Sequence, residues 1–300
     1  MEEHIFFNNK ILLKSKAKIS IESPGFLFGD GIFETIKSCG GKLHDLDLHL
    51  ERLVDSMKAL KYALMQNELF KSSIKKSIEK LLEINNLLNC EANIKIITSR
   101  GIYAKKLDME STRDFDLIIM ASLTSSINKH YYGKGVNIIS SAIKRTSEEN
   151  FIYKHKLINY FENIFAKNEA NCLKAQEAVF LTCDGYILEG SASNFFIVVE
   201  GNVITPSLSQ NILPGITRKI IINLCKKNNI NISERKIRYE EIAGSDEIFL
   251  TNSILEVMPV RKFDNFEFKD NVPGDTTKKL MCLYKEYESD AAGIPGSRFA

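Results

Sequence analysis

The stretch Tyr153-Lys154-His155-Lys156-Leu157-Ile158-Asn159-Tyr160 joins a basic cluster to apolar positions that recur at helical spacing as far as residue 171. This spacing predicts an amphipathic helix over 157–171, with Lys156 immediately before its first turn. Beside an apolar helical face a lysine can be desolvated, which lowers its affinity for a proton and makes its amine a nucleophile. The alternative is a cluster of basic residues that face solvent. The stretch by itself leaves both interpretations open.

The residues before this stretch predict a half that mixes strands with two amphipathic helices. Apolar residues from Leu46 to Leu60 step by 4, 3, 4 and 3, which is typical of a helix with Asp45 as its N-cap. The other elements expected are a hairpin over 5–21 that turns at Asn8-Asn9, a glycine-punctuated loop over 25–31, a strand over 32–36, a turn at Gly40-Gly41, a helix over 67–84, and strands over 93–99 and 115–122.

A second half with both strands and helices follows a polar segment. Its expected elements are a strand over 136–143, the helix over 157–171, a hairpin with its tip at Asp184-Gly185, a strand over 195–199, a turn at Gly201-Asn202, a helix over 216–227, and strands near Ile232, Ile248 and Val257. We therefore expect an N-terminal domain over 1–122, a linker over 123–134, a C-terminal domain over 135–290 and a disordered tail over 291–300.

Composition excludes several classes of protein. Lysine and arginine number 40 against 38 aspartates and glutamates, a net charge of +2 with both signs interspersed, so nucleic acid and anionic membranes are not expected partners. No window approaches the roughly 18 uninterrupted apolar residues of a membrane span, and the N-terminus lacks the pattern of a signal peptide. The 6 cysteines and 5 histidines are scattered, which predicts free thiols and no metal site. A cytoplasmic protein is expected.

Two further segments have chemistry that a bound ligand would use. Pro214-Gly215 precedes the helix over 216–227, whose first amides lack partners in the helix and can hold a phosphate, although many helices begin this way. Glu189 lies at a strand end before small residues that would permit the close approach of a flat ligand. By itself this second segment is only a polar loop.

Seven segments occur in one order along the chain, at residues 28–35, 49–53, 99–101, 156–170, 189–196, 212–218 and 251–259. Together they resemble the class IV, or fold type IV, pyridoxal-phosphate enzymes, which include branched-chain aminotransferases, D-amino acid aminotransferases and 4-amino-4-deoxychorismate lyases. The resemblance implies an α+β fold of two domains, a small N-terminal α/β sandwich-like domain and a larger C-terminal pseudo-barrel. It also implies pyridoxal 5′-phosphate as the cofactor.

The resemblance gives individual residues a role. Lys156 resembles the Schiff-base lysine, Glu189 the carboxylate that pairs with the pyridine nitrogen, and Arg52 the arginine that contacts the phosphate. The other residues implied at the cofactor are Ile216 and Thr217 through their amides, Ser253, Tyr160 near the phenolic oxygen, and Asn194 as a brace for the loop around Glu189. For Tyr160 the alternative is a core aromatic, and for Arg52 a surface arginine paired with Asp55 or Glu51.

The resemblance indicates the cofactor more firmly than it indicates which reaction the enzyme catalyses. Thr35 follows Phe33-Glu34 where the lyases carry threonine, whereas the segment 100–107 lacks the histidine with which D-amino acid enzymes trap a substrate carboxylate. Candidate substrate contacts are Phe33, Thr35, Ile254 and a cation from Lys95, Lys37, Arg100 or Lys105. We expect a homodimeric aminotransferase that acts on a branched-chain-like amino acid and a 2-oxo acid. The alternatives are a 4-amino-4-deoxychorismate lyase, a D-amino acid aminotransferase, and an inactive homologue that binds the cofactor.

Overall fold

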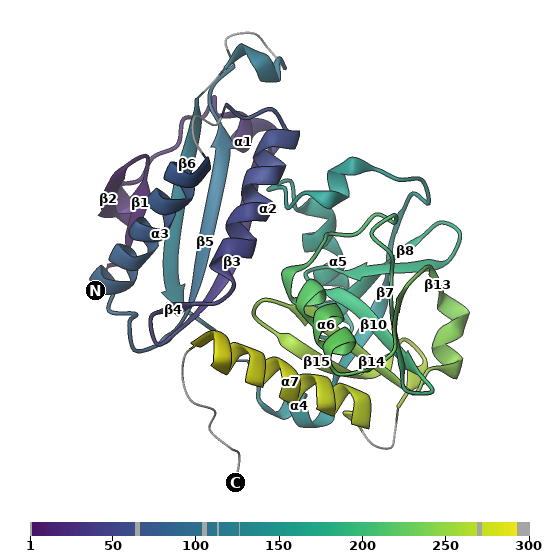
Figure 1. The fold of residues 1–300 in the computed structure, drawn as a ribbon. Coiled ribbons are helices and arrows are strands. Elements are labelled where there is room, and N and C mark those ends of the chain that lie inside the picture. Colours follow the sequence, from purple (N-terminus) through teal and green to yellow (C-terminus); the bar gives the residue numbers. More distant parts are fainter. Residues whose placement is uncertain are drawn as a thin grey trace. The chain divides into compact units, whose positions relative to one another are not determined.

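The computed structural model describes residues 2–63, 67–103, 107–112, 114–125, 127–268 and 272–292, and it divides into two compact units (Figure 1). Unit 1 comprises Met1–Ser125 and His155–Tyr160, and unit 2 comprises Ser126–Lys154 and Phe161–Ala300. The segment that carries Lys156 thus belongs to the N-terminal unit. Lys105 and residues 293–300 of the expected tail lie outside the described residues.

Unit 1 is built on an antiparallel sheet with the strand order β2-β1-β6-β5-β3-β4. The strands are β1 (His4–Phe7), β2 (Lys10–Leu13), β3 (Gly31–Cys39), β4 (Lys42–Leu43), β5 (Glu91–Arg100) and β6 (Phe115–Leu123). The hairpin at Asn8-Asn9 is confirmed, and both residues have the positive φ, 45° and 68°, that a type I′ turn requires. It ends earlier than expected, because Lys14–Lys16 form a 3₁₀ turn.

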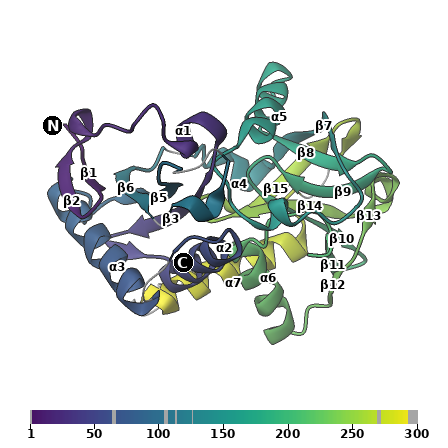
Figure 2. The same ribbon diagram turned by 90° about the horizontal axis from the view of Figure 1, so that it is seen from above.

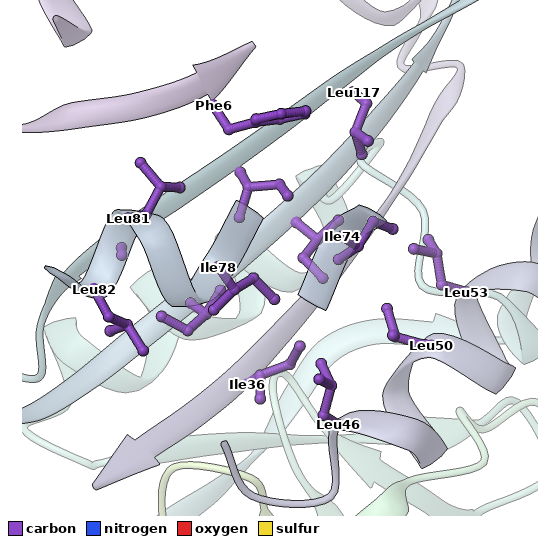
Figure 3. Packing of buried hydrophobic residues seen from close by; sticks show 14 of the residues in the cluster. Phe6, Ile36, Leu46, Leu50, Leu53, Ile74, Ile78, Leu81, Leu82 and Leu117 are labelled. Carbon is purple, nitrogen blue, oxygen red and sulfur yellow. The ribbon is translucent and has the colours of Figure 1, made fainter. Parts of the chain in front are cut away.

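Two helices, α2 (Leu46–Ala59) and α3 (Asn67–Ile84), pack on this sheet, and both confirm the expected helices. Leu50 and Leu53 of α2 and Ile78 of α3 meet Ile36 of β3 in one buried cluster (Figure 3). Asp45 precedes α2 with a φ of 53° and makes no side-chain cap hydrogen bond. Asp45 is thus the N-cap residue, as predicted, but the left-handed backbone at Asp45 turns the chain into the helix without a hydrogen bond from its carboxylate to the first turn.

A short helix, α1 (Pro24–Phe28), occupies most of the stretch that we expected to be a loop. Pro24 stands at its first position, where the fixed φ of proline suits a helix and its missing N–H costs nothing. Gly29 ends the helix with a φ of 71°, a conformation that glycine adopts without strain.

Unit 2 contains a sheet that closes on itself. Its strands are β7 (Val136–Arg145), β8 (Glu177–Thr182), β9 (Tyr186–Gly190), β10 (Asn194–Val199), β11 (Asn202–Thr205), β12 (Ile232–Glu234), β13 (Ile237–Arg238), β14 (Glu247–Asn252), β15 (Glu256–Phe263) and β16 (Phe266–Glu267). Neighbours run β10-β14-β15-β7-β8-β9, and β9 pairs with β10 again through Glu189 and Asn194. Apolar side chains from all six strands pack into one cluster, so the ring is a filled pseudo-barrel.

Helices flank this ring. Figure 2 shows α5 (Phe161–Cys172) on one side of the strands and α6 (Ile216–Lys227) and α7 (Asp275–Ala292) on the other. Helix α6 confirms its prediction, whereas α7 was not foreseen. The short α4 (His130–Lys134) lies inside the segment expected as a linker, and 3₁₀ turns span Met109–Ser111, Phe151–Lys154 and Tyr239–Gly244. None of the described helices has the length and apolar character needed to cross a bilayer.

The predicted start of the helix over 157–171 is wrong, because α5 begins at Phe161. Residues before it run alongside β3 of unit 1: the Phe33 amide donates to the Lys156 carbonyl at 2.8 Å, and the Ile158 amide donates to the Gly31 carbonyl at 3.0 Å. Leu157 forms an isolated bridge with Ile32. Lys156 therefore stands on extended backbone that is hydrogen-bonded to a strand.

Candidate active site

In unit 1, the Lys156 amine lies over aromatic rings. Its Nζ is 4.5 Å from the ring centroid of Phe33 and 5.6 Å from that of Tyr160. The two rings themselves meet edge to face with centroids 5.3 Å apart. The amine thus lies beside two aromatic rings, whose faces attract a cation.

Three of the expected substrate residues lie on this same face of the sheet. Phe33 and Thr35 are two residues apart on β3, so their side chains point the same way. Lys95 is the register partner of Thr35 on β5, and its Nζ lies 5.0 Å from the Phe33 ring centroid. Unit 1 thus brings together Lys156, Tyr160, Phe33, Thr35 and Lys95.

Arg52 belongs to a second cluster in unit 1, around the fully buried Glu34. Its Nε and Nη2 donate to the two carboxylate oxygens of Glu34, each at 2.7 Å, and His49 Nδ1 lies 2.7 Å from Oε2. Burial would raise the pKa of Glu34, but Arg52 and the hydrogen bonds from Arg52 and His49 lower it to about 2. The alternative of a surface arginine paired with Asp55 or Glu51 is therefore wrong, because the guanidinium fork is bound to an interior carboxylate.

Arg100 is only 1% exposed and is held by groups of its own unit. Its Nε donates to Asp30 at 2.7 Å, its Nη2 donates to the Leu60 carbonyl at 2.6 Å, and its guanidinium lies 4.2 Å from the Tyr62 ring centroid. Through these contacts Arg100 links the end of β5 to Asp30 and to the residues after α2. We therefore correct the expectation that Arg100 supplies the cation for a substrate.

In unit 2, the buried carboxylate of Glu189 receives donors from three directions. Arg145 Nη1 donates to Oε1 at 2.8 Å, while Oε2 accepts the Leu213 amide at 2.9 Å and the Asn194 side-chain amide at 3.4 Å. Asn194 also donates to the Leu213 carbonyl at 2.9 Å. Asn194 thus links the Glu189 carboxylate to the segment that leads into α6, as expected of a brace.

Arg145 is a residue of this site that sequence reasoning missed. Its guanidinium lies 4.3 Å from the Tyr153 ring centroid and 3.9 Å from that of Phe180, and its Nε donates to Glu162 at 3.3 Å. Stacking on these two rings fixes the orientation of the Arg145 guanidinium plane, from which Nη1 donates to Glu189. The only sequence signal was a basic residue at the end of a predicted strand, which many surface residues share.

The N-terminus of α6 comes shortly after Leu213, the residue that contacts Glu189 and Asn194. Gly215 precedes it without a side-chain cap, and Ile216 and Thr217 occupy the first, buried turn. A Cβ added at Gly215 would overlap Asn194 Oδ1, so only glycine fits. Ser253 and Ile254 lie in the turn after β14, where Asn252 Oδ1 accepts the Ile254 amide at 2.9 Å. Unit 2 therefore places Glu189, Asn194 and the start of α6 together.

Comparisons with known proteins agree with these features. The model of the family "Amino-transferase class IV" matches residues 31–263. A Methanocaldococcus jannaschii protein named "Putative branched-chain-amino-acid aminotransferase" is 30% identical over 282 residues, 94% of this chain and 95% of that protein. The aminodeoxychorismate lyase of Bacillus subtilis is 30% identical over 287 residues, 94% of each. The branched-chain amino acid aminotransferase structure from Escherichia coli has a TM-score of 0.89 at 24% identity and covers 100% of this chain and 98% of that one.

The structural likeness confirms the fold class, the α+β fold type IV architecture with its pseudo-barrel. The family match extends over most of the chain, from β3 to β15. Class IV aminotransferases use pyridoxal 5′-phosphate, so the family and cofactor that the resemblance implied are confirmed as well. The chain belongs to the class IV aminotransferases and is an enzyme of that family.

Proposed function

We propose that the chain transfers an amino group between a branched-chain-like amino acid and a 2-oxo acid, with Lys156 as the catalytic amine. The observation that carries this proposal is the position of Lys156, whose backbone is hydrogen-bonded to β3 while its amine lies over Phe33 and Tyr160. The Methanocaldococcus jannaschii relative supports the branched-chain assignment.

The residues of each unit fit the cofactor. Bound pyridoxal 5′-phosphate supplies a carbonyl that reacts with amines and a ring that withdraws electrons. At the start of α6, Gly215 leaves the backbone open and the amides of Ile216 and Thr217 face no side-chain cap. The hydroxyl of Thr251, opposite Asn194 on β14, is buried and has no hydrogen-bond partner in the described structure, as expected near a site for an additional polar ligand.

Each side chain then has a defined task. The Lys156 amine would hold the cofactor and would move the proton at the substrate carbon. Glu189, with Arg145 beside it, would offer its carboxylate to the ring nitrogen and would favour the protonated form of that nitrogen. In unit 1, Arg52, with its fork fixed by Glu34, would contribute a phosphate contact. In unit 2, the α6 amides and Ser253 would contribute phosphate contacts. Tyr160 would donate to the phenolic oxygen, and Asn194 holds the loop around Glu189.

The substrate contacts come from the sheet face of unit 1 that bears Lys156. We assign the carboxylate contact to Lys95, whose ammonium lies over the Phe33 ring beside Thr35. On this face Phe33 supplies apolar surface for a branched side chain, in line with the branched-chain assignment. Ile254, in the turn after β14 of unit 2, is a separate proposed contact.

A second candidate function is that of a 4-amino-4-deoxychorismate lyase, which eliminates pyruvate on the route to 4-aminobenzoate. Two observations favour it: Thr35 stands on the Lys156 face of β3, and the Bacillus subtilis lyase is as similar to this chain as the Methanocaldococcus jannaschii relative is. Activity on D-amino acids and loss of turnover with retained cofactor binding are the remaining alternatives.

Borohydride trapping tests the catalytic lysine. Reduction of the protein with its cofactor, followed by peptide mapping, should label Lys156 and not Lys154, which pairs with Glu149. Lys154→Met is the matched control and should leave labelling intact, whereas Lys156→Ala should abolish it. A label on any other lysine would refute the assignment. A panel of L- and D-amino donors, read at the cofactor absorbance band, and an assay of pyruvate release from aminodeoxychorismate then separate the candidate reactions.

We also propose a cytoplasmic homodimer. All six cysteines are free thiols, which supports a reducing compartment. Large apolar side chains are exposed in each unit, among them Phe26 at 71% and Phe161 at 74%, which supports association with a second copy. Sedimentation equilibrium should give twice the 34.0 kDa chain mass, and a monomer at micromolar concentration would contradict the dimer.

A further inference from the structure

The strand ring of unit 2 closes through one residue pair. Glu189, near the end of β9, and Asn194, the first residue of β10, are the register partners that join these strands. They also close the hairpin loop of residues 190–193, in which the Gly190 amide donates to the Ser193 carbonyl at 2.7 Å. Because loop conformation fixes the register of a hairpin, residues 190–193 determine how Glu189 and Asn194 are aligned.

A buried carboxylate, Glu177 at the start of β8, lies against the inside of this loop and is 3% exposed. Its Oε1 accepts the Ser191 amide at 3.2 Å and the Ser191 hydroxyl. Its Oε2 accepts the Ala192 amide at 3.3 Å and the Ser193 hydroxyl at 3.0 Å. With the Ala178 amide at 2.9 Å, the partners of Glu177 in the described structure are all neutral N–H and O–H groups. Both oxygens therefore act as acceptors, and every residue from 191 to 193 is tied to one side chain.

The outside of the loop is held as well. Asn163 of α5 donates to the Ser191 carbonyl at 2.7 Å, and Asn252 of β14 donates to the Ala192 carbonyl at 2.8 Å. A Cβ added at Gly190 would overlap the Ser193 hydroxyl, so the loop is also closely packed. The Ser191 amide donates to the Ala178 carbonyl as well, at 2.8 Å, whereas the Ala192 amide and the Ser191 and Ser193 hydroxyls donate to Glu177. Glu177 therefore supplies the side-chain acceptor for the middle of the loop.

We propose that Glu177 is a positioning residue that sets the alignment of Glu189 through the loop of residues 191–193. The inference rests on the proposed role of Glu189 at the cofactor ring. Glu177 touches neither substrate nor cofactor in this scheme. Glu177 fixes the conformation of the loop from its inside. The loop in turn fixes the pairing of Glu189 with Asn194, so that Glu189 would face the ring nitrogen and Asn194 would hold Glu189 in place.

Glu177→Gln is the direct test, because the amide keeps the size of the side chain but replaces one acceptor oxygen with a donor that faces other donors. Glu169→Gln is the matched control: Glu169 lies in the same unit and accepts the Ser141 hydroxyl at 2.6 Å and the Ala142 amide at 3.3 Å, on β7 instead of the hairpin. Hydrogen exchange of the full chain, with and without pyridoxal phosphate, should be about 5- to 10-fold faster at Ala192, whose amide donates to Glu177, in Glu177→Gln only.

Kinetics and spectra then show whether the loop serves catalysis. We expect Glu177→Gln to lower kcat about 10- to 100-fold with KM for the amino donor nearly unchanged, and to shift the pH midpoint of the bound cofactor band. Unchanged exchange at Ala192 would overturn the proposal, as would faster exchange with an unchanged kcat and band. If Glu177→Gln does not fold, Ser193→Ala removes one donor from the same carboxylate and is judged by the same criteria. The exchange experiment does not depend on the reaction, so it separates failure of this inference from failure of the proposed function.

Discussion

The buried cluster of Glu34, Arg52 and His49 predicts a defined loss of stability in acid. The pKa of Glu34 lies at about 2 against an ordinary value of 4.5, because Arg52 and His49 outweigh the effect of burial. At roughly 1.4 kcal/mol per pH unit, this difference corresponds to about 3 kcal/mol of stability at neutral pH. Because the folded value is the lower one, that contribution is complete above pH 4.5 and is lost as the pH falls from 4.5 to about 2.

His49 adds an earlier stage of the same sign. Burial lowers its pKa below the ordinary 6.5, although Glu34 acts in the opposite direction. The unfolded chain therefore takes up the His49 proton first, and stability begins to fall as the pH drops below about 6.5. Unit 1 should lose stability in two stages, the first from His49 and the second from Glu34.

The assay is urea denaturation between pH 7.5 and pH 3, followed by hydrogen exchange in β3 and α2 peptides so that unit 1 is observed separately. Glu34→Gln should be less stable than wild type by about 3 kcal/mol at pH 7 and should lose little more between pH 4.5 and pH 3. Parallel pH profiles for the two proteins over this range would refute the conclusion that Arg52 and His49 hold Glu34 ionised in the interior.

Three further predictions concern the cofactor. In the Glu34→Gln background, where no buried anion is left unpaired, Arg52→Ala should raise the pyridoxal phosphate Kd about 10- to 100-fold in a fluorescence titration; equal affinities would remove Arg52 from the phosphate site. Glu189→Gln should reduce the rate by on the order of 10²–10³ with little change in cofactor Kd, and an unchanged rate would mean that the ring is oriented differently. Gly215→Ala should weaken cofactor binding and lower Tm, because the added methyl group overlaps Asn194; wild-type behaviour in both measurements would contradict that packing.

Much of the fold could be predicted from local pattern. Helices α3 and α6 have the residue bounds that their apolar spacing indicated, and the Asn8-Asn9 turn has the left-handed backbone that its sequence requires. The start of α5 could not be found this way, because Leu157 and Tyr160 fit a helical stripe equally well. Pairing of the Lys156 segment with β3, which is distant in sequence, decides its conformation.

Residues of the candidate site could be predicted from the sequence only where they belong to a recognisable motif. The segment with Phe33 and the distant segment with Lys156 and Tyr160 were identified from their resemblance to a family, and the structure of unit 1 brings these residues together. Arg100 was a candidate from its place at the end of β5, yet its partners Asp30 and the Leu60 carbonyl come from other segments, and no local sequence pattern indicates those contacts.

Three buried glutamates show why sequence alone could not assign their roles. Glu34, Glu189 and Glu177 are each the same residue type on a strand, but their charges are balanced differently. Glu34 has two donors from α2 that carry or can carry charge, Glu189 has Arg145, and Glu177 has neutral amides and hydroxyls. A carboxylate bound to a cation can fix that cation for a ligand, as we propose for Arg52. A carboxylate surrounded by loop amides fixes the loop instead, and for that reason the loss of Glu177 should be detected in the alignment of Glu189 and not in the affinity for phosphate.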